Sequence, residues 1–456
     1  MEYLSNVSMI YFRKAYLLGI QLAFYNVNEG RDNVTNQEIL KLLKREVVPA
    51  LGCTEPIAVA LAAAKASEEL KNRPESVEVY VSANILKNGM GVGVPGTGMT
   101  GLYIATALGC IGGKSEKELE VLSDVTQQDV EDAKKMVKDN KIKVNLKDIK
   151  EKLYIEVIAK ENDNYAKVVI RKQHSNIVLV EFNDKVIYKI DEEPENVKAD
   201  NSKLKLTVDE IYNFALSVDI EDVKFLLDGA KMNKDLADEA LNNNYGLQVG
   251  KTILKGIESG FYSDDIQSYA KALTAAAADA RMSGCMHAVM SNSGSGNQGI
   301  TVSLPVYAVA LKLNADEEKT IRALTISNLI AIHIKTYLGR LSALCGCVVA
   351  STGSSCGITY LLGGELKNIK YSIKNMIGDI SGMVCDGAKC GCALKVSTGV
   401  SSAIQSAMLA INDIEISYHD GIVDDDVENT IKNLCMLGIE GMNNADKVML
   451  DIMVSK

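Results

Sequence analysis

Apolar residues follow two different periods along the chain, and the change between them divides it into parts. Residues 36–50 have the apolar spacing of a helix, with Thr35 as a plausible N-cap and Glu38 three positions later. After a turn at 49–52, a second, alanine-rich helix runs from near Cys53 to residue 70. The pattern therefore predicts two consecutive helices at the start of the folded part.

Residues 76–83 instead alternate apolar and polar side chains, as a half-buried strand does. Helices are expected over 101–109 and within 115–138. Four further short alternating runs, separated by Asn/Asp turns, predict an antiparallel sheet of about four or five strands; they are 154–159, 166–171, 176–182 and 185–190.

From residue 207 to the end, helical periods dominate, with expected glycine-rich loops at 291–299, 351–364 and 381–399. The predicted class is α+β, a mostly helical body with an inserted module that carries a small antiparallel sheet. The polar stretch 191–202 is the expected linker. The expected divisions are an N-terminal extension (1–35), helices docking on the C-terminal body (36–75), the sheet-bearing module (76–195) and the helical body (205–456).

Composition excludes several classes of function. The chain has 456 residues, 47% of them hydrophobic, which is enough for a full core without disulfides. A net charge of −10, no tryptophan and 5% aromatic residues argue against nucleic-acid binding. No clean apolar run of membrane-spanning length occurs, and residues 1–35 lack a typical export signal. We expect a cytoplasmic protein that binds a small molecule. The sequence leaves open whether the protein forms a homo-oligomer.

Cysteine is concentrated near the C-terminus. Six of the ten cysteines fall between Cys345 and Cys392, in glycine-rich apolar segments that contain two C-x-C pairs. Clustered thiols in a non-secreted protein indicate a metal or an iron–sulfur cluster before disulfides. Zinc and buried structural thiols remain alternatives, although the C-x₂-C pairs typical of structural zinc are missing.

Cys53 and the loop 291–299 are the other candidates for chemistry. Cys53 begins a helix, where the positive end of the helix dipole is expected to lower the pKa of a thiol. The loop 291–299 offers backbone N–H, hydroxyl and amide donors suited to an amino-acid zwitterion. His287 is a weaker acid–base candidate; it and His333 read more readily as core residues, and His174 and His419 as surface residues.

Several long motifs resemble one known family. Val48-Pro-Ala-Leu-Gly-Cys-Thr-Glu-Pro-Ile-Ala, Ser293-Gly-Ser-Gly-Asn-Gln-Gly-Ile, Cys345-Gly-Cys and Cys385-Asp-Gly-Ala-Lys-Cys-Gly-Cys resemble the L-cysteine desulfidase family, which is related to the α-chain of iron–sulfur L-serine dehydratases. The resemblance runs from about residue 36 to the C-terminus.

The resemblance implies a [4Fe–4S] cluster on Cys345, Cys385 and Cys392, whose spacing of 40 and then 7 residues matches the family. It also implies a functional cysteine, Cys53, as the base. The other members of the C-x-C pairs, Cys347 and Cys390, have no role in that scheme, so the choice within each pair stays open.

The expected reaction is β-elimination of L-cysteine to pyruvate, sulfide and ammonia without pyridoxal phosphate. Its substrate-binding groups would come from the glycine-rich loops at 88–101 and 291–299, chiefly from four side chains: Ser293, Ser295, Asn297 and Gln298. Three alternatives remain open. They are the same chemistry on L-serine, a pyridoxal-phosphate enzyme with Lys389 or Lys395 as its Schiff-base residue, and a non-catalytic iron–sulfur redox-sensing protein.

Overall fold

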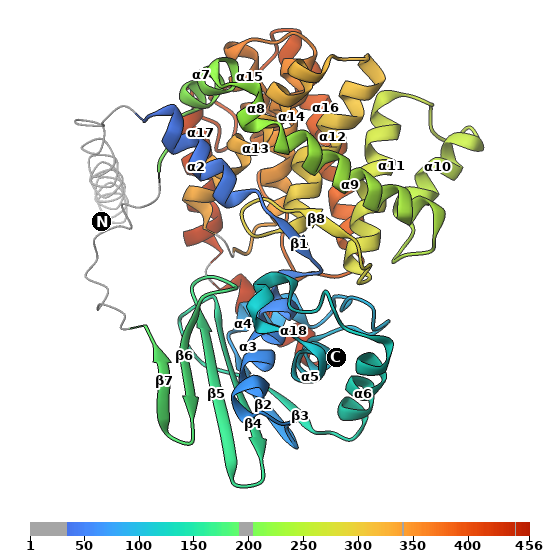
Figure 1. The fold of residues 1–456 in the computed structure, drawn as a ribbon. Helices are drawn as coiled ribbons and strands as arrows, with labels where there is room; N and C mark the ends of the chain where they lie inside the picture. Colours follow the sequence, from blue (N-terminus) through green and yellow to red (C-terminus); the bar gives the residue numbers. More distant parts are fainter. Residues whose placement is uncertain (1–33, 191–203, 340–341, 443) are drawn as a thin grey trace, which may run out of the picture.

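The computed structural model describes residues 34–190, 204–339, 342–442 and 444–456. Two hydrophobic cores organise it, one inside a large helical body and one between a sheet and the helices that cover it (Figure 1). The predicted α+β class is confirmed. Residues 1–33 of the expected extension and the whole of the expected linker (191–202) lie outside the described residues.

The smaller part is built on a six-stranded sheet of strand order β3-β2-β4-β5-β6-β7. Every second residue along β2 is buried, so one face of the sheet is shielded from solvent. Helix α3 packs on that face, against β4 and β5. The strands are β2 (Ser76–Val81), β3 (Ile142–Leu146), β4 (Tyr154–Glu161), β5 (Asn164–Arg171), β6 (Ile177–Phe182) and β7 (Lys185–Lys189). The helices are α3 (Thr54–Leu70), α4 (Ala83–Gly89), α5 (Leu102–Gly112), the 3₁₀ turn η1 (Ser115–Glu120) and α6 (Gln127–Lys138).

The expectation of a purely antiparallel sheet is corrected at one edge. Strand β3 pairs parallel with β2, and all other neighbours in this sheet pair antiparallel. A parallel partner must return by a crossover, here through α4, α5 and α6. The sequence gives β3 little signal, because at the edge it alternates weakly and has one buried residue, Ile142.

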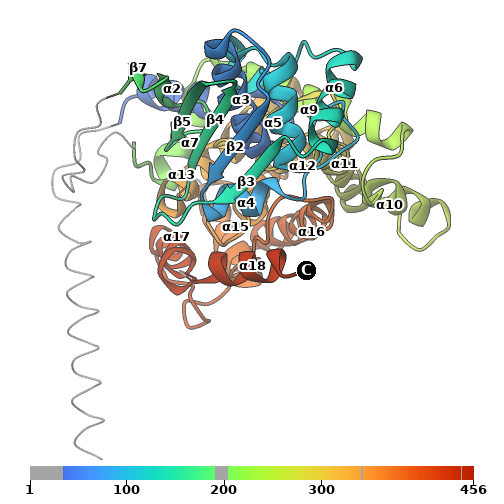
Figure 2. The same cartoon turned by 90° about the horizontal axis from the view of Figure 1, so that it is seen from below.

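The larger part is an assembly of helices around the main core (Figure 2). Its helices are α2 (Asn36–Glu46), α7 (Val208–Ser217), α8 (Ile220–Val223), α9 (Phe225–Asn242), α10 (Val249–Glu258), α11 (Ile266–Met282), α12 (Gly296–Leu313), α13 (Glu317–Leu338), α14 (Gly346–Leu361), α15 (Leu366–Asp379), α16 (Cys392–Ile411), α17 (Val427–Met436) and the π-helical turn η2 (Leu437–Gly441). Threonine residues cap the N-termini of α2, α6 and α7, each in a capping box, as predicted for Thr35 and Glu38.

The expected glycine-rich loop at 351–364 is largely helical. Gly353 and Gly357 lie inside α14, where it crosses α13. A Cβ atom on Gly353 would lie 2.3 Å from the Ser327 carbonyl oxygen, and one on Gly357 would lie 2.7 Å from that of Ala323. These glycines therefore permit close helix packing rather than a turn.

The two parts are joined by short segments that cross between them. The helices of residues 36–75 divide: α2 packs in the main core, whereas α3 packs on the sheet, so the expectation that both dock on the C-terminal body is corrected. Between them, β1 (Pro49–Leu51) pairs antiparallel with β8 (Ala288–Met290), where we expected only a turn. At the other end of the chain, α18 (Ala445–Val454) packs on α4 of the sheet-bearing part (Figures 1 and 2).

Among the described residues, no helix combines the length and apolarity needed to cross a bilayer.

Candidate functional site

Cys53 lies where β1 turns into α3. Gly52 makes the turn with a φ of +74°, and Cys53 is the N-cap residue of α3. Its buried side chain packs in a small cluster with Val92 and Met282, against which Cys392 also packs. The pairing of β1 with β8 thus carries Cys53 into the boundary between the two parts of the molecule.

Two of the C-terminal cysteines are brought together by backbone pairing. The N–H of Cys345 donates to the Met383 carbonyl at 2.7 Å, and the N–H of Cys385 donates to the Ala343 carbonyl at 2.8 Å. These antiparallel contacts place Cys345 and Cys385 beside each other, where both line one cavity. Cys392, the first residue of α16, completes the group.

The donor set fits an iron–sulfur cluster held by three residues. Three thiols converge from a helix N-cap, a loop and a helix first turn, and clusters of this kind are held by Cys thiolates. Gly387, with a φ of +93°, lines the same cavity; a Cβ atom there would come within 2.3 Å of the Lys87 carbonyl oxygen. The loop between Cys385 and Cys392 can therefore lie close to the backbone of α4 at Lys87 only because residue 387 is glycine.

The two C-x-C pairs differ in how their second members lie. Cys347 lines the cavity beside Cys345, with its sulfur 3.8 Å from the Met383 sulfur. Cys390 does not line it, and its sulfur lies 3.9 Å from the Ser283 hydroxyl oxygen.

The pKa values of the Cys53, Cys345, Cys385 and Cys392 thiols are all raised, so these four thiols are neutral in the protein alone. Burial raises the pKa of Cys53 from 9.0 to about 12, against the opposing charge of Arg281. The expectation of a lowered pKa is therefore wrong for the metal-free protein, because desolvation of the thiolate outweighs the helix N-terminus. The neighbouring Cys345 thiol and burial also raise the pKa of Cys385. Metal binding here must release protons.

Residues 291–299, expected to be a loop, are a loop only as far as Ser295, because α12 begins at Gly296. This segment faces the same cavity, whose volume is about 120 Å³. Ser293, Ser295, Asn297 and Gln298 all line it together with the cysteines 53, 345, 385 and 392. Ser295 caps α12 by accepting the N–H of Gln298 at 3.3 Å.

The side chain of Gln298 is only half engaged. Its Nε2 donates to the Asn292 amide oxygen at 2.8 Å. Its buried Oε1 has no hydrogen-bond partner among the described residues. A free buried acceptor that lines a cavity is available to an N–H donor of a ligand.

Sequence reasoning missed three charged residues of the cavity, namely Arg281, Glu55 and Lys335. Arg281 is 5% exposed and donates to the Asn297 side chain (3.3 Å) and to the Gly52 carbonyl (3.1 Å); within the described residues it has no carboxylate partner and its Nε is unbonded. Glu55 accepts from Thr54 (3.1 Å) and Asn88 (3.0 Å). In the sequence, Arg281 could have been noticed as a single arginine directly after the alanine-rich run 275–280. Glu55 could have been noticed as an acidic residue two positions after Cys53.

Other candidates lie differently from expectation. His174 was expected at the surface but is buried and lines the cavity, whereas His287 was expected in the core and is exposed outside the cavity. His333 is a core residue, with Nε2 2.8 Å from the Glu428 carboxylate.

The glycine-rich loop 88–101 has mainly a packing role. Only Asn88 of this loop lines the cavity. Gly93 donates its N–H to the Met282 carbonyl at 2.9 Å, and a Cβ atom there would lie 2.3 Å from the Ser283 backbone. The close approach of these two backbones explains the glycine.

Comparison with known proteins places the chain in a family. The family described as Serine dehydratase alpha chain matches residues 116–451, and the chain belongs to this family. It is similar to the "UPF0597 protein" of Parabacteroides distasonis, with 49% identity over 428 residues that cover 93% of this chain and 99% of the relative. The protein of the same name from Bacteroides thetaiotaomicron is 49% identical over 421 residues (92% and 98%), and that from Clostridium perfringens is 48% identical over 419 residues (91% and 98%).

Proposed function

We propose that the protein is an iron–sulfur-dependent lyase that converts L-cysteine to pyruvate, sulfide and ammonia, an L-cysteine desulfidase. The observation that carries the proposal is one cavity lined by Cys53, by the thiols of Cys345, Cys385 and Cys392, and by groups of both charges. Membership of the serine dehydratase alpha-chain family, which uses iron–sulfur chemistry, supports a lyase of this type.

The thiolates of Cys345, Cys385 and Cys392 would hold a [4Fe–4S] cluster. Three protein ligands leave one iron open, and this iron would supply a Lewis acid for the sulfur that leaves the substrate. Burial of the site excludes water and strengthens every charge interaction around the substrate.

The remaining steps fall to side chains of the chain. The Arg281 guanidinium, which lacks a carboxylate partner among the described residues, would bind the substrate carboxylate in a bidentate way. The Glu55 carboxylate and the free Gln298 Oε1 would accept hydrogen bonds from the substrate ammonium. Together they would orient the Cα–H bond toward Cys53.

Cys53 would take the Cα proton while the Cβ–S bond breaks, giving 2-aminoacrylate and sulfide. The product tautomerises to an imine, and water then releases pyruvate and ammonia. Because burial raises the pKa of Cys53, the thiolate needs the Arg281 charge nearby to form. Arg281 therefore has two roles, in binding and in favouring the base.

L-Serine is the alternative substrate for the same machinery. The pyridoxal-phosphate alternative is disfavoured, because Lys389 and Lys395 both form ion pairs with Asp386 and neither lines the cavity. A redox-sensing protein would need the thiols but would not need the charged side chains of Arg281 and Glu55 in the cavity. We further propose a cytoplasmic location, since no cysteine among the described residues forms a disulfide.

The test is an assay of anaerobically purified protein for iron, labile sulfide and turnover. We expect sulfide release from L-cysteine with a higher kcat/KM than pyruvate formation from L-serine, because a soft iron prefers a thiolate. Cys345→Ala, Cys385→Ala and Cys392→Ala should each lose iron and activity, whereas Cys110→Ala, at a buried thiol outside the cavity, should keep both.

Three outcomes would change the assignment. A kcat/KM on L-serine equal to or above that on L-cysteine would move it to serine dehydratase. Bound cluster without turnover on either amino acid would favour the redox-sensing alternative. Stoichiometric zinc on the three thiols without labile sulfide would refute the iron–sulfur proposal.

A further inference from the structure

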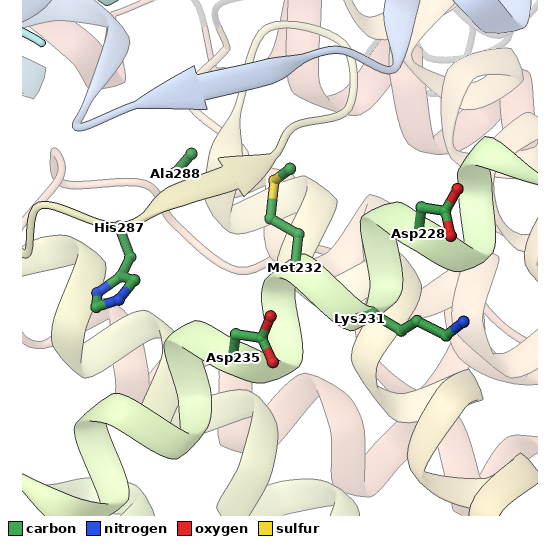
Figure 3. A pocket seen from close by; sticks show the side chains of 6 residues that line it. All are labelled: Asp228, Lys231, Met232, Asp235, His287 and Ala288. Atoms are coloured by element: carbon green, nitrogen blue, oxygen red, sulfur yellow. The ribbon is translucent and has the colours of Figure 1, made fainter.

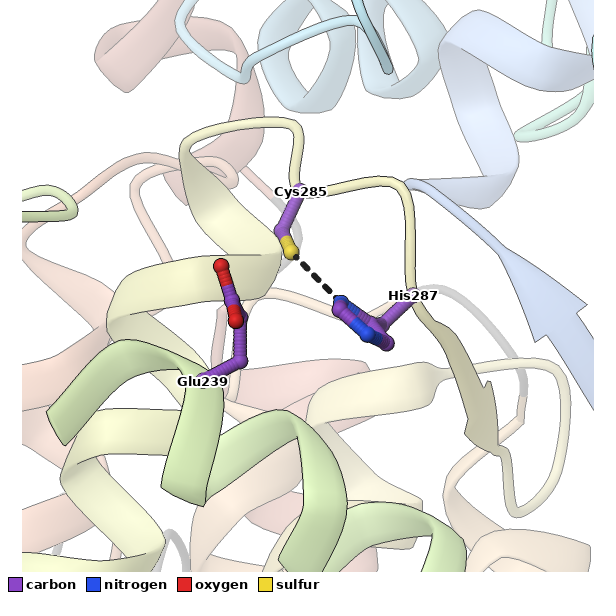
Figure 4. Close-up of side chains that lie close together, drawn as sticks. All are labelled: Glu239, Cys285 and His287. Atoms are coloured by element: carbon purple, nitrogen blue, oxygen red, sulfur yellow. Dashed lines mark hydrogen bonds between the residues drawn. The ribbon is translucent and has the colours of Figure 1, made fainter. Parts of the chain in front are cut away.

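A second group of metal-binding side chains lies outside the cavity that contains Cys53. Glu239 lies near the end of α9, and Cys285 and His287 lie in the segment between α11 and β8. The Cys285 sulfur and the His287 Nδ1 are 3.3 Å apart, and one ligand atom from each of the three residues falls within 4.8 Å of the others. Figure 4 shows the three side chains directed toward a common point.

We propose that Glu239, Cys285 and His287 form a zinc site with a water as the fourth ligand. Zinc takes thiolate, imidazole and carboxylate ligands in a tetrahedron, at about 2.3 Å from sulfur and 2.0–2.1 Å from nitrogen. In a tetrahedron with these bond lengths, sulfur and nitrogen are about 3.5 Å apart. The observed 3.3 Å separation is therefore close to the distance in the bound state, and a carboxylate oxygen of Glu239 lies within 4.8 Å of both atoms.

A surrounding residue already orients one of the ligands. The Tyr245 hydroxyl donates a hydrogen bond to Glu239 Oε1 at 3.0 Å. Groups that hold metal ligands from outside in this way fix their orientation and typically contribute 10–100-fold to metal affinity. The donor set thus has the ligand types and the supporting contact of a real site.

The site also has a path to solvent. His287 borders a surface hollow of about 300 Å³ together with Asp228 and Asp235 of α9 (Figure 3). Asp235 is one helical turn before Glu239, so carboxylates line the approach of a cation. Lys231 lies on the same hollow and tempers this charge.

The metal would fasten the start of β8 to α9. The far end of this strand is already fastened, because Asn233 of α9 exchanges two hydrogen bonds with the Met290 backbone, at 2.9 and 3.2 Å. With both ends held, β8 would place the loop 291–299 and its partner β1 more rigidly. This fastening does not depend on the proposed lyase reaction, so zinc binding can be measured whether or not that reaction occurs.

The test uses full-length protein with its cluster, treated with zinc chloride, passed through a desalting column and analysed for zinc. We expect one zinc per chain, with zinc X-ray absorption showing one sulfur at about 2.3 Å and nitrogen or oxygen neighbours at about 2.0–2.1 Å. Glu239→Gln, Cys285→Ser and His287→Gln should each lose this zinc. The matched control, His419→Gln at an exposed histidine away from the group, should keep it.

A milder variant keeps the proposal testable if these substitutions disturb folding. Tyr245→Phe should bind zinc about tenfold more weakly, in competition with a chromophoric chelator. Absence of zinc from the desalted protein would overturn the proposal. So would three sulfur neighbours, which would put zinc on the thiols of the cavity, or unchanged zinc binding in Cys285→Ser and His287→Gln.

Discussion

We expect the buried Lys87–Asp446 ion pair to hold the C-terminal helix α18 against α4. The Lys87 side chain is 1% exposed; its ammonium lies 2.6 Å from Asp446 of α18 and 3.0 Å from the Cys385 carbonyl oxygen. Asp446 also accepts a hydrogen bond from Asn84 at 2.9 Å. The perturbation is Asp446→Asn, which leaves a buried cation without a counter-charge.

Breaking a buried pair by removing one partner costs about 3–5 kcal/mol. Asp446 is 17% exposed, and Lys87 keeps its bond to Cys385, so the lower end applies, about 3 kcal/mol. If α18 opens as a local unit, its amide protons should exchange roughly 100-fold faster. The Cys385 segment, which holds the same ammonium, should also retain its iron less well.

Hydrogen exchange followed by mass spectrometry over residues 445–454 is the assay. Asp451→Asn is the matched control, an exposed carboxylate on the same helix, and should stay within about 0.5 kcal/mol of the original protein. Replacing the pair together, with Lys87→Met and Asp446→Leu, should restore much of the protection, because no charge is then left buried. Equal exchange rates in Asp446→Asn and Asp451→Asn would refute the reasoning.

Four further outcomes are expected. Cys53→Ala should keep iron and labile sulfide but lose roughly 10²–10⁴-fold in kcat, the usual cost of removing a general base. In Arg281→Gln, KM for the amino acid should rise, and the pH at which activity appears should also rise, because the cation opposes the burial that raises the pKa of Cys53. Cys390→Ala should retain iron where Cys392→Ala loses it. Burial raises the pKa of Asp279 from 3.8 to about 6, so this carboxyl stabilises the fold fully below its unfolded pKa and loses that contribution as the pH rises through 6. The unfolding free energy relative to Asp279→Asn should therefore fall by up to about 3 kcal/mol between about pH 4 and pH 7.

Each of these has a contrary result. Iron-free Cys53→Ala would make that residue a ligand, and normal turnover would make it a packing residue. An unchanged KM in Arg281→Gln would separate the arginine from the substrate. Iron loss in Cys390→Ala would exchange the roles within that C-x-C pair. A pH-independent difference in unfolding free energy for Asp279→Asn would show that the carboxyl keeps its ordinary pKa.

The sequence determined the elements and the candidate chemistry. Period and capping signals predicted α2 from its Thr35 cap, α3 from Cys53 onward and five of the six strands of the sheet, because local side-chain spacing reports directly on which face is buried. The candidate cysteines and the loop 291–299 came from motif and composition, since residue types limit which chemistry is available.

Only the tertiary structure decided which of these residues lie together in one cavity. Strand β3 and the helical glycines of α14 depend on contacts with segments distant in sequence, which no local pattern contains. The pairing of β1 with β8 and of the segments 343–345 and 383–385 brings the cysteines and loop 291–299 into one cavity. Arg281 and Glu55 entered the site only there. The direction of the Cys53 pKa shift also reversed, because burial is a property of the whole packed molecule, whereas a helix N-terminus can be read from a few neighbouring residues.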